Sequence, residues 1–151
     1  MAPRFTKITP SLPVSNIPSA IEYYTEILGF RLAGRDGDNH CWLQIVDDES
    51  VGKYDAAVNV YLRKRGFPGI ENDVQCGKIY ITIGGEADEL EMLHQKLVEK
   101  KALVKGSVSV KPWGLKDATV EDHDGNVIIF NQRVEGFQVP PNTIMMGQKP
   151  T

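Results

Sequence analysis

The sequence contains an internal repeat, and this repeat constrains the fold more than any single motif. A predicted strand, a helix and three further strands occupy residues 6–65, and the same order recurs in residues 77–132. Ser15 before the first helix matches Gly84 before the second, an offset of 69 residues. Each unit is too short to cover both faces of its own sheet. We therefore predict an α+β fold in which tandem β-α-β-β-β modules form a cupped mixed sheet.

The first module begins with an irregular strand and an amphipathic helix. Pro10 and Pro13 restrict the strand to the edge of a sheet, because proline cannot donate a hydrogen bond to a neighbouring strand. Residues 17–29 place their apolar side chains on one helical face. Pro18 suits the first turn of this helix and Gly29 suits its left-handed end.

A hairpin and a third strand complete the first module. The turn at residues 36–39 separates the two strands of the hairpin, and residues 56–65 form the strand that follows. Alternation along the second hairpin strand puts His40, Trp42 and Gln44 on one face. His40 follows the turn directly, so we expect it to be exposed. The mixed composition of this face indicates a wet cavity rather than a dry core.

The second module repeats these elements, and a tail follows it. Its helix is predicted in residues 86–101, with an apolar face of Leu90, Leu93, Leu97 and Val98. Its strands are predicted in residues 77–83, 102–110, 116–122 and 126–132. The tail, residues 133–151, is interrupted by Pro and Gly. We therefore expect residues 1–151 to form a single domain of two modules and a C-terminal tail.

Composition excludes several classes of protein. The chain has 151 residues, of which 41% are hydrophobic and 25% charged, as in ordinary globular domains. A net charge of -3 and a pI of about 5.6 weigh against nucleic acid as a partner, because binding to nucleic acid needs clustered Lys and Arg. No window approaches the ~18 apolar residues of a membrane span. We expect a cytoplasmic protein with no membrane partner.

Two segments of the sequence resemble the vicinal oxygen chelate superfamily. These are "LPVSNIPSAIEYYTEILGF" and, later in the chain, "PWGLKDATVEDHDGNVIIF". The superfamily includes glyoxalase I, extradiol dioxygenases, and fosfomycin- and bleomycin-resistance proteins. The likeness covers roughly residues 6–132 and includes the tandem order of elements. The motifs "PWG", "DHDGN" and "GGEADEL" are most similar to the bleomycin-resistance branch.

The resemblance also shows where enzymes of the superfamily hold a divalent metal, typically with His, Gln or Glu. The first strands of the two modules place Thr9 and Lys78 at these positions, and the last strand places Ile129 there. The last strand of the first module offers Asn59, Val60 and Tyr61. Transition metals prefer His, Cys or carboxylate ligands. We therefore expect no metal site and no metal cofactor.

The remaining candidate residues favour ligand binding. Trp42 and Trp113 carry large apolar faces that could stack on a planar ligand at the mouth of the cup, although both could equally be packing residues. Polar and aromatic side chains on neighbouring strands could line the same cavity. The candidate binding residues are Trp42, Gln44, Asn59, Tyr61, Tyr80, Trp113 and Thr119.

Glu121 is the candidate catalytic residue. Alternation puts Asp117, Thr119 and Glu121 on one strand face and Ala118 and Val120 on the other. If the first face lines the cup, Glu121 could serve as a general acid or base. If that face is exposed to solvent, Glu121 is an ordinary surface charge.

Two functions of different classes follow from these observations. The first is a metal-free protein that sequesters a small, partly aromatic molecule in a cleft between modules or subunits. The alternative is an enzyme of the superfamily, a lyase, isomerase or dioxygenase, that uses a metal or uses Glu121 with a tyrosine such as Tyr61. Superfamily likeness also leads us to expect a symmetric homodimer.

Overall fold

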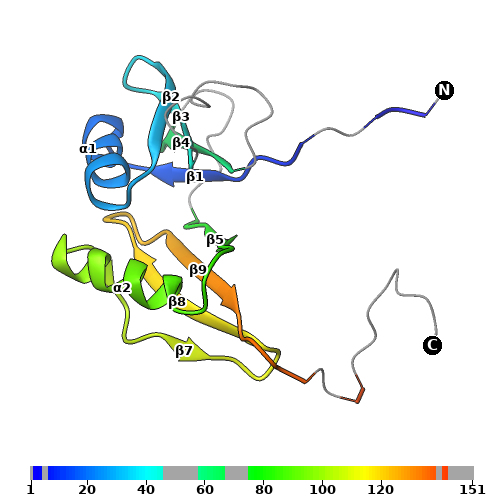
Figure 1. Ribbon diagram of the computed structural model, residues 1–151. Helices are drawn as coiled ribbons and strands as arrows, with labels where there is room; N and C mark the ends of the chain where they lie inside the picture. Colours follow the sequence, from blue (N-terminus) through cyan, green and yellow to red (C-terminus); the bar gives the residue numbers. More distant parts are fainter. Residues whose placement is uncertain (1, 5–6, 46–57, 67–74, 139–140, 143–151) are drawn as a thin grey trace.

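The structure is a computed structural model that describes residues 2–4, 7–45, 58–66, 75–138 and 141–142. Two sheets, each with one helical segment on one face, make up this part of the chain (Figure 1). The helices lie on the same side of the molecule, and the sheets extend away from them. None of the described helices is long and apolar enough to cross a membrane.

The first sheet comes from the first module and has the strand order β1-β4-β3-β2. β1 pairs with β4 in parallel, whereas the other neighbouring strands are antiparallel. β1 is an edge strand, as Pro13 within it and Pro10 just before it predict. Its strands are β1 (Ser11–Val14), β2 (Arg31–Asp36), β3 (His40–Gln44) and β4 (Asn59–Lys64).

The second sheet repeats this topology with the order β5-β9-β8-β6, and β7 also pairs with β8. β5 pairs with β9 in parallel, as β1 does with β4. The equivalent pairing in both sheets confirms the predicted α+β fold of tandem β-α-β-β-β modules. Its strands are β5 (Lys78–Thr82), β6 (Leu103–Val104), β7 (Ser109–Val110), β8 (Leu115–Glu121) and β9 (Val127–Arg133).

The first helical segment changes type midway. α1 (Ile17–Glu22) is an α-helix, and a π-helix, η1 (Tyr23–Ile27), continues it. The side chain of Asn16 caps the start of α1 by accepting a 2.9 Å bond from Ser19 N. The wider π turn lets two consecutive tyrosines, Tyr23 and Tyr24, both point towards the second module, where both hydroxyls find partners. Sequence periodicity predicted one continuous α-helix here, and the paired tyrosines account for the difference.

A residue from a neighbouring strand caps the second helix. α2 (Glu89–Glu99) has no side-chain cap at its own N-terminus. Instead Gln132 on β9 accepts a 3.2 Å bond from Leu90 N and donates a 2.7 Å bond to Glu86 O. Leu90 and Leu97 are buried against the sheet, but Val98 is 51% exposed. Placing Val98 on the buried face was wrong, because the apolar stripe of α2 is narrower than predicted.

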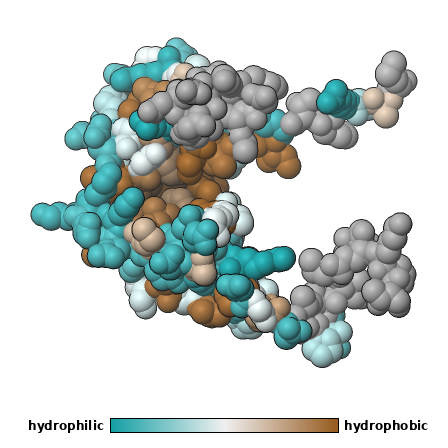
Figure 2. Space-filling model, in the orientation of Figure 1, coloured by the Kyte–Doolittle hydropathy of each residue, from teal (hydrophilic) through white to brown (hydrophobic). Residues whose placement is uncertain are grey.

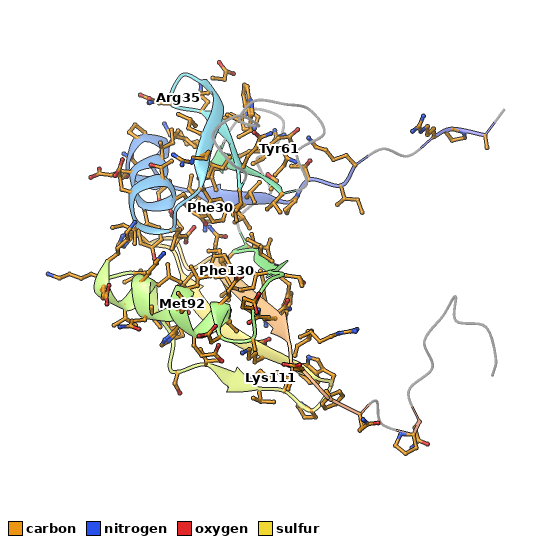
Figure 3. All side chains as sticks on the ribbon, in the orientation of Figure 1. Phe30, Arg35, Tyr61, Met92, Lys111 and Phe130 are labelled. Carbon is orange, nitrogen blue, oxygen red and sulfur yellow. The ribbon has the colours of Figure 1, made fainter. Side chains whose placement is uncertain are left out.

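Polar bonds join the two modules within one chain. Asn126, which is fully buried, donates a 2.8 Å bond from Nδ2 to Pro13 O in β1. Asn126 Oδ1 accepts a 2.7 Å bond from Gly77 N, just before β5. Figure 3 labels Phe30 and Phe130, two phenylalanines of the buried core, one from each module. The junction therefore holds the first strands of both modules close together.

Candidate functional site

The helices leave one face of each sheet uncovered. In the first sheet, Leu12, Cys41 and Leu43 are buried in the core that packs against α1. In the second sheet, Ala118, Val120 and Ile128 are buried in the same core. Side chains that alternate with these residues must point the opposite way, into the space between the modules. Figure 2 shows this space as a hollow that opens away from the helices and has hydrophobic residues on its walls.

An aromatic cluster lies on the uncovered face of the first sheet. The ring of His40 lies 5.4 Å from that of Trp42 and 5.2 Å from that of Tyr61, measured between centroids. Arg63 stacks on Tyr61, with its guanidinium carbon 5.5 Å from the ring centroid. Figure 3 shows Tyr61 on the side of the molecule away from α1. His40, Trp42, Tyr61 and Arg63 form what we call the ring cluster.

His40 differs from the sequence prediction. It is half-buried in the ring cluster, and its Nε2 atom is buried without a hydrogen-bond partner. Burial lowers the pKa of His40, and the nearby positive charge of Arg63 lowers it further. The prediction of an exposed histidine was wrong because Trp42, two residues along β3, and Tyr61 on β4 both pack against its ring.

A glycine on the neighbouring strand gives Trp42 its position. Gly34 lies opposite Trp42 in the register of β2 and β3, and the register shifts beside it. A Cβ atom on Gly34 would overlap the indole ring. The ring therefore lies flat across the glycine backbone, and Trp42 stays 36% exposed. Its outer face is available to a planar ligand.

A polar pair continues this face beyond the ring cluster. Gln44 lies opposite Asn59 in the register of β3 and β4. Gln44 Nε2 donates a 2.9 Å bond to Asn59 Oδ1. The two amides are therefore held in position beside the aromatic rings.

The uncovered face of the second sheet carries the remaining strand candidates. Tyr80 is 58% exposed, and Lys78 Nζ lies 5.6 Å from the centroid of its ring. Thr119 lies opposite Ile129 in the register of β8 and β9. Glu121 is on the same face and makes a 3.4 Å ion pair with Lys105. The alternation predicted for β8 is thus confirmed, with Glu121 paired and partly exposed at one end of the strand.

A groove of about 180 Å³ runs between the two sheets. It brings together two predicted binding residues, Asn59 on β4 and Tyr80 on β5, that are 21 positions apart in the sequence. Thr82, one step further along β5, also lines it. Its walls are otherwise apolar: Ile8, Pro10, Val58, Val60, Ile79 and Ile81.

The positions where enzymes of the superfamily hold a metal carry unsuitable side chains here. Lys78 is a cation, and Ile129 is apolar and buried. Thr9 offers one hydroxyl at the entrance of β1. No three His, Cys, Asp or Glu side chains converge anywhere in the described part of the chain. These residues do not fit a transition-metal centre.

Trp113 lies apart from the groove residues. It belongs to the turn between β7 and β8, where Gly114 N bonds to Lys111 O, and it is 62% exposed. A Cβ atom on Gly114 would overlap Phe137 of the following segment. Trp113 is therefore accessible, but none of the other candidate residues, all of which lie in the described ranges, is recorded in contact with it.

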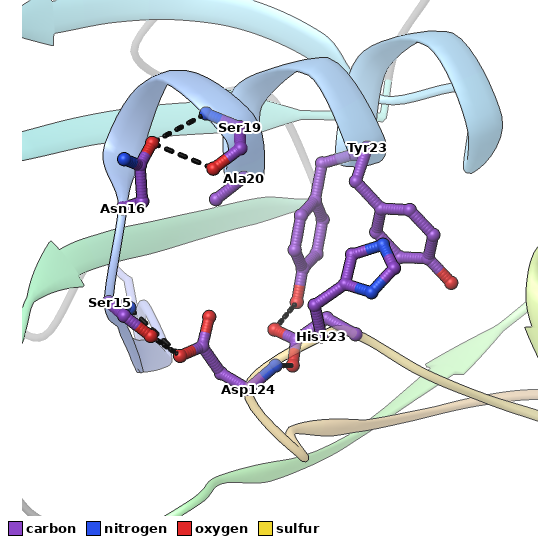
Figure 4. Close-up of a pocket in the computed structure, with 9 residues that line it drawn as sticks. Ser15, Asn16, Ser19, Ala20, Tyr23, His123 and Asp124 are labelled. Carbon is purple, nitrogen blue, oxygen red and sulfur yellow. Dashed lines mark hydrogen bonds between the residues drawn. The ribbon is translucent and has the colours of Figure 1, made fainter.

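A second cleft, of about 110 Å³, lies on the helix side of the module junction (Figure 4). Ser15 donates to Asp124 from both its backbone and its hydroxyl, and Tyr23 Oη donates a 2.6 Å bond to Glu121 O. The ring of His123 packs edge-on against that of Tyr23, with centroids 4.9 Å apart. These polar groups partner one another, so this cleft is a structural junction.

The sequence reasoning missed one pair of residues on the uncovered face of the second sheet. Asp117 and Asn131 are directly opposite in the register of β8 and β9, and both are buried. The Oδ1 atom of each has no hydrogen-bond partner. The signal in the sequence was a single Asn-Gln step after the apolar run Val127–Phe130.

This fold and site define a class of protein in which paired β-α-β-β-β modules enclose a cup. The sequence-family model of the Glyoxalase/Bleomycin resistance protein/Dioxygenase superfamily matches residues 5–130 of this chain. The chain belongs to this superfamily. No curated protein sequence matches it significantly.

Solved structures with a similar fold include both a lyase and a binding protein. A glyoxalase/bleomycin resistance protein/dioxygenase from Nocardioides aligns with TM-score 0.70 and 13% identity, covering 96% of this chain and 93% of its own. A lactoylglutathione lyase from Agrobacterium tumefaciens aligns with TM-score 0.66 and 12% identity, covering 90% of this chain and 100% of its own. The bleomycin-binding protein of Streptomyces verticillus, complexed with copper(II)-bleomycin, aligns with TM-score 0.60 and 15% identity. The alignment covers 85% of this chain and 97% of that protein. These likenesses show the shared fold and favour no branch.

Proposed function

We propose that this protein is a metal-free binding protein that holds a small, partly aromatic organic molecule in its cup. The observation that carries the proposal is the ring cluster beside the Gln44–Asn59 pair. It combines an exposed indole face with fixed hydrogen-bonding amides, which is the usual composition of a small-molecule site. The adjoining groove extends this surface to Tyr80 on the second sheet.

The exposed rings supply the binding energy in this proposal. Trp42 and Tyr80 are large, rigid side chains whose apolar surface is still in contact with water. Covering apolar surface contributes roughly 25 cal/mol per Å², so a planar ligand that buries both rings gains several kcal/mol before ordering costs. Glycine at position 34 already holds the indole in place, which reduces those costs.

Two observations make binding a better proposal than metal-assisted catalysis. Lys78 and Ile129 occupy positions that carry metal ligands in the enzymes of the superfamily, and neither can coordinate a cation. In addition, the bleomycin-binding protein of Streptomyces verticillus has this fold, so the fold can serve a binding protein. The second argument is an analogy between folds.

The enzyme alternative centres on Glu121. This carboxylate is on the uncovered face, but it is ion-paired with Lys105, and its backbone carbonyl accepts from Tyr23. The ammonium of Lys105 lies beside the oxygen that would take a proton from a substrate. A turnover screen with Glu121→Gln as the inactive reference tests this alternative directly.

Native mass spectrometry of the protein purified from its host tests the proposed function. We expect a co-purified organic molecule that is lost on denaturation, and no stoichiometric transition metal. Trp42→Ala should lower retention of that molecule, whereas Met92→Ala, an exposed position on α2, should not. Stoichiometric zinc, iron, manganese or nickel held by the native protein would overturn the proposal.

We also propose that the protein is a homodimer. β7 pairs only with β8 among the described strands, and the nearby Val110 and Trp113 are 66% and 62% exposed. An unpaired strand edge with exposed apolar side chains favours association. Sedimentation should give twice the chain mass of 16.8 kDa, and a monomer at micromolar concentration would contradict this.

A further inference from the structure

Two buried oxygen atoms in the second sheet have no hydrogen-bond donor. Asp117 is 7% exposed and Asn131 is 4% exposed, and the Oδ1 atom of each is buried without a partner. The residues are directly opposite each other in the register of β8 and β9. An unsatisfied buried acceptor costs about 1–3 kcal/mol, and more if it is charged. Two unsatisfied acceptors on adjacent strands therefore need an explanation.

The flanking residues show which way this pair points. Lys116 Nζ reaches Glu91 on α2 at 2.8 Å, and Gln132 bonds to the start of α2. Because side chains alternate along a strand, Asp117 and Asn131 point away from α2 and towards the cup. On that side Asn131 has Thr82 as its cross-strand neighbour in β5, and Thr82 lines the groove. Asn131 is thus next to a residue of the groove, and Asp117 is next to Asn131.

The surrounding charges leave Asp117 without a cation. No lysine or arginine in the described ranges makes an ion pair with it. Arg133 is on the same face and diagonal to Asp117 in the register, but among the described residues the two make no ion pair. Lys78 lies four residues before Thr82, about 13 Å away along the strand. The end of the cup near Asp117 therefore offers acceptors and a negative charge.

We propose that Asp117 and Asn131 bind a positively charged N–H donor of the ligand, a primary ammonium group. This inference rests on the proposed function and adds the chemical class of the ligand: a planar ring that carries an amine. An ammonium supplies donors to both oxygens and compensates the carboxylate charge, and such charge-assisted bonds are the strong ones. Both oxygens are almost fully enclosed, which favours a small primary ammonium over a bulky cation.

Three probes with one ring system test this proposal by calorimetric titration: tryptamine, its N,N,N-trimethyl derivative and neutral 3-ethylindole. We expect tryptamine to bind at least about tenfold more tightly than either of the others. The trimethyl derivative has the same charge but no ammonium N–H and a larger head group, so it separates charge alone from donation and fit together. Binding of 3-ethylindole alone reports on the rings and hence on the proposed function.

Asp117→Asn is the diagnostic variant, because it removes the charge and adds an amide that can donate to Asn131 Oδ1. It should abolish the preference for tryptamine, leave 3-ethylindole binding unchanged and raise the melting temperature. Asp88→Asn, at the exposed start of α2, is the matched control and should retain the preference. Methylammonium chloride should raise the melting temperature of the native protein more than equimolar tetramethylammonium chloride, and not that of Asp117→Asn.

The outcomes separate this inference from the proposed function. Equal affinity for tryptamine and 3-ethylindole would overturn the ammonium site and leave the binding function supported. A preference that persists in Asp117→Asn would overturn it as well. If no ring probe binds, the proposed function fails, and the methylammonium experiment then decides whether Asp117 and Asn131 bind an ammonium group.

Discussion

The hydroxyl of Tyr24 donates a 2.8 Å hydrogen bond to Oδ2 of Asp122, 98 residues further along the chain. The other oxygen of Asp122 accepts 2.9 Å bonds from the backbone of Asp124 and Asn126. One buried carboxylate therefore shapes the last turn of the second module and attaches it to the helical segment of the first. The motif "DHDGN" at this turn is visible in the sequence, but its attachment to Tyr24 is seen only in the structure.

Tyr24→Phe should destabilise the protein by about 1–2 kcal/mol, because it leaves a buried carboxylate oxygen one donor short. The free energy of unfolding in urea at pH 7 measures this loss. Tyr80→Phe removes a hydroxyl from an exposed tyrosine and is the matched control, with little expected change. Equal stability of the two variants would show that the bond contributes nothing to the junction.

Stability should fall at alkaline pH through the same tyrosine. Burial raises the pKa of Tyr24, and the charge of Asp122 raises it further. The pKa of this tyrosine is higher in the folded protein than its unfolded value of about 10. Its contribution to stability is therefore complete below pH 10 and is lost as the pH rises above it. Urea midpoints between pH 8 and 11 should therefore decline less steeply in Tyr24→Phe than in the native protein. Parallel declines would contradict this assignment.

Mild acid should weaken the fold through His40. Burial and then the charge of Arg63 lower its pKa, so the folded protein resists a proton that the unfolded chain accepts below about pH 6.5. The contribution to stability is present above that pH and is lost as the pH falls towards the folded-state pKa. The melting temperature should change less between pH 7 and 5 in His40→Gln than in the native protein. His94→Gln, on α2, should retain the native dependence.

Gly34→Ala should disturb the ring cluster without touching a ligand. The added methyl group overlaps the indole of Trp42, so the ring must move, at a cost of about 1–3 kcal/mol in stability. A shift in tryptophan fluorescence and weaker binding of 3-ethylindole should accompany the loss. Gly84→Ala has open space around it and a backbone that alanine tolerates, so it should behave as the native protein does.

Much of the architecture was readable from local patterns. Pro10 and Pro13, the turn before β3 and the alternation in β8 each reflect a constraint within a few residues. The repeat shows that the order of elements occurs twice. Strand faces were predicted correctly because side-chain direction alternates strictly along a strand. The predicted rings and amides on the strands consequently lie on the uncovered faces, whereas Trp113 lies in a turn, and the role of all of them in binding stays a prediction.

The sequence by itself determined the tandem fold, the direction of the candidate side chains and the replacement of metal-binding residues by Lys78 and Ile129. Only the tertiary structure decided which residues meet across strands: His40 with Tyr61, Gly34 with Trp42, and Asp117 with Asn131. The physical reason is that strand register and burial depend on contacts between distant segments. A pattern along one strand cannot show whether a polar atom has found a partner on the next.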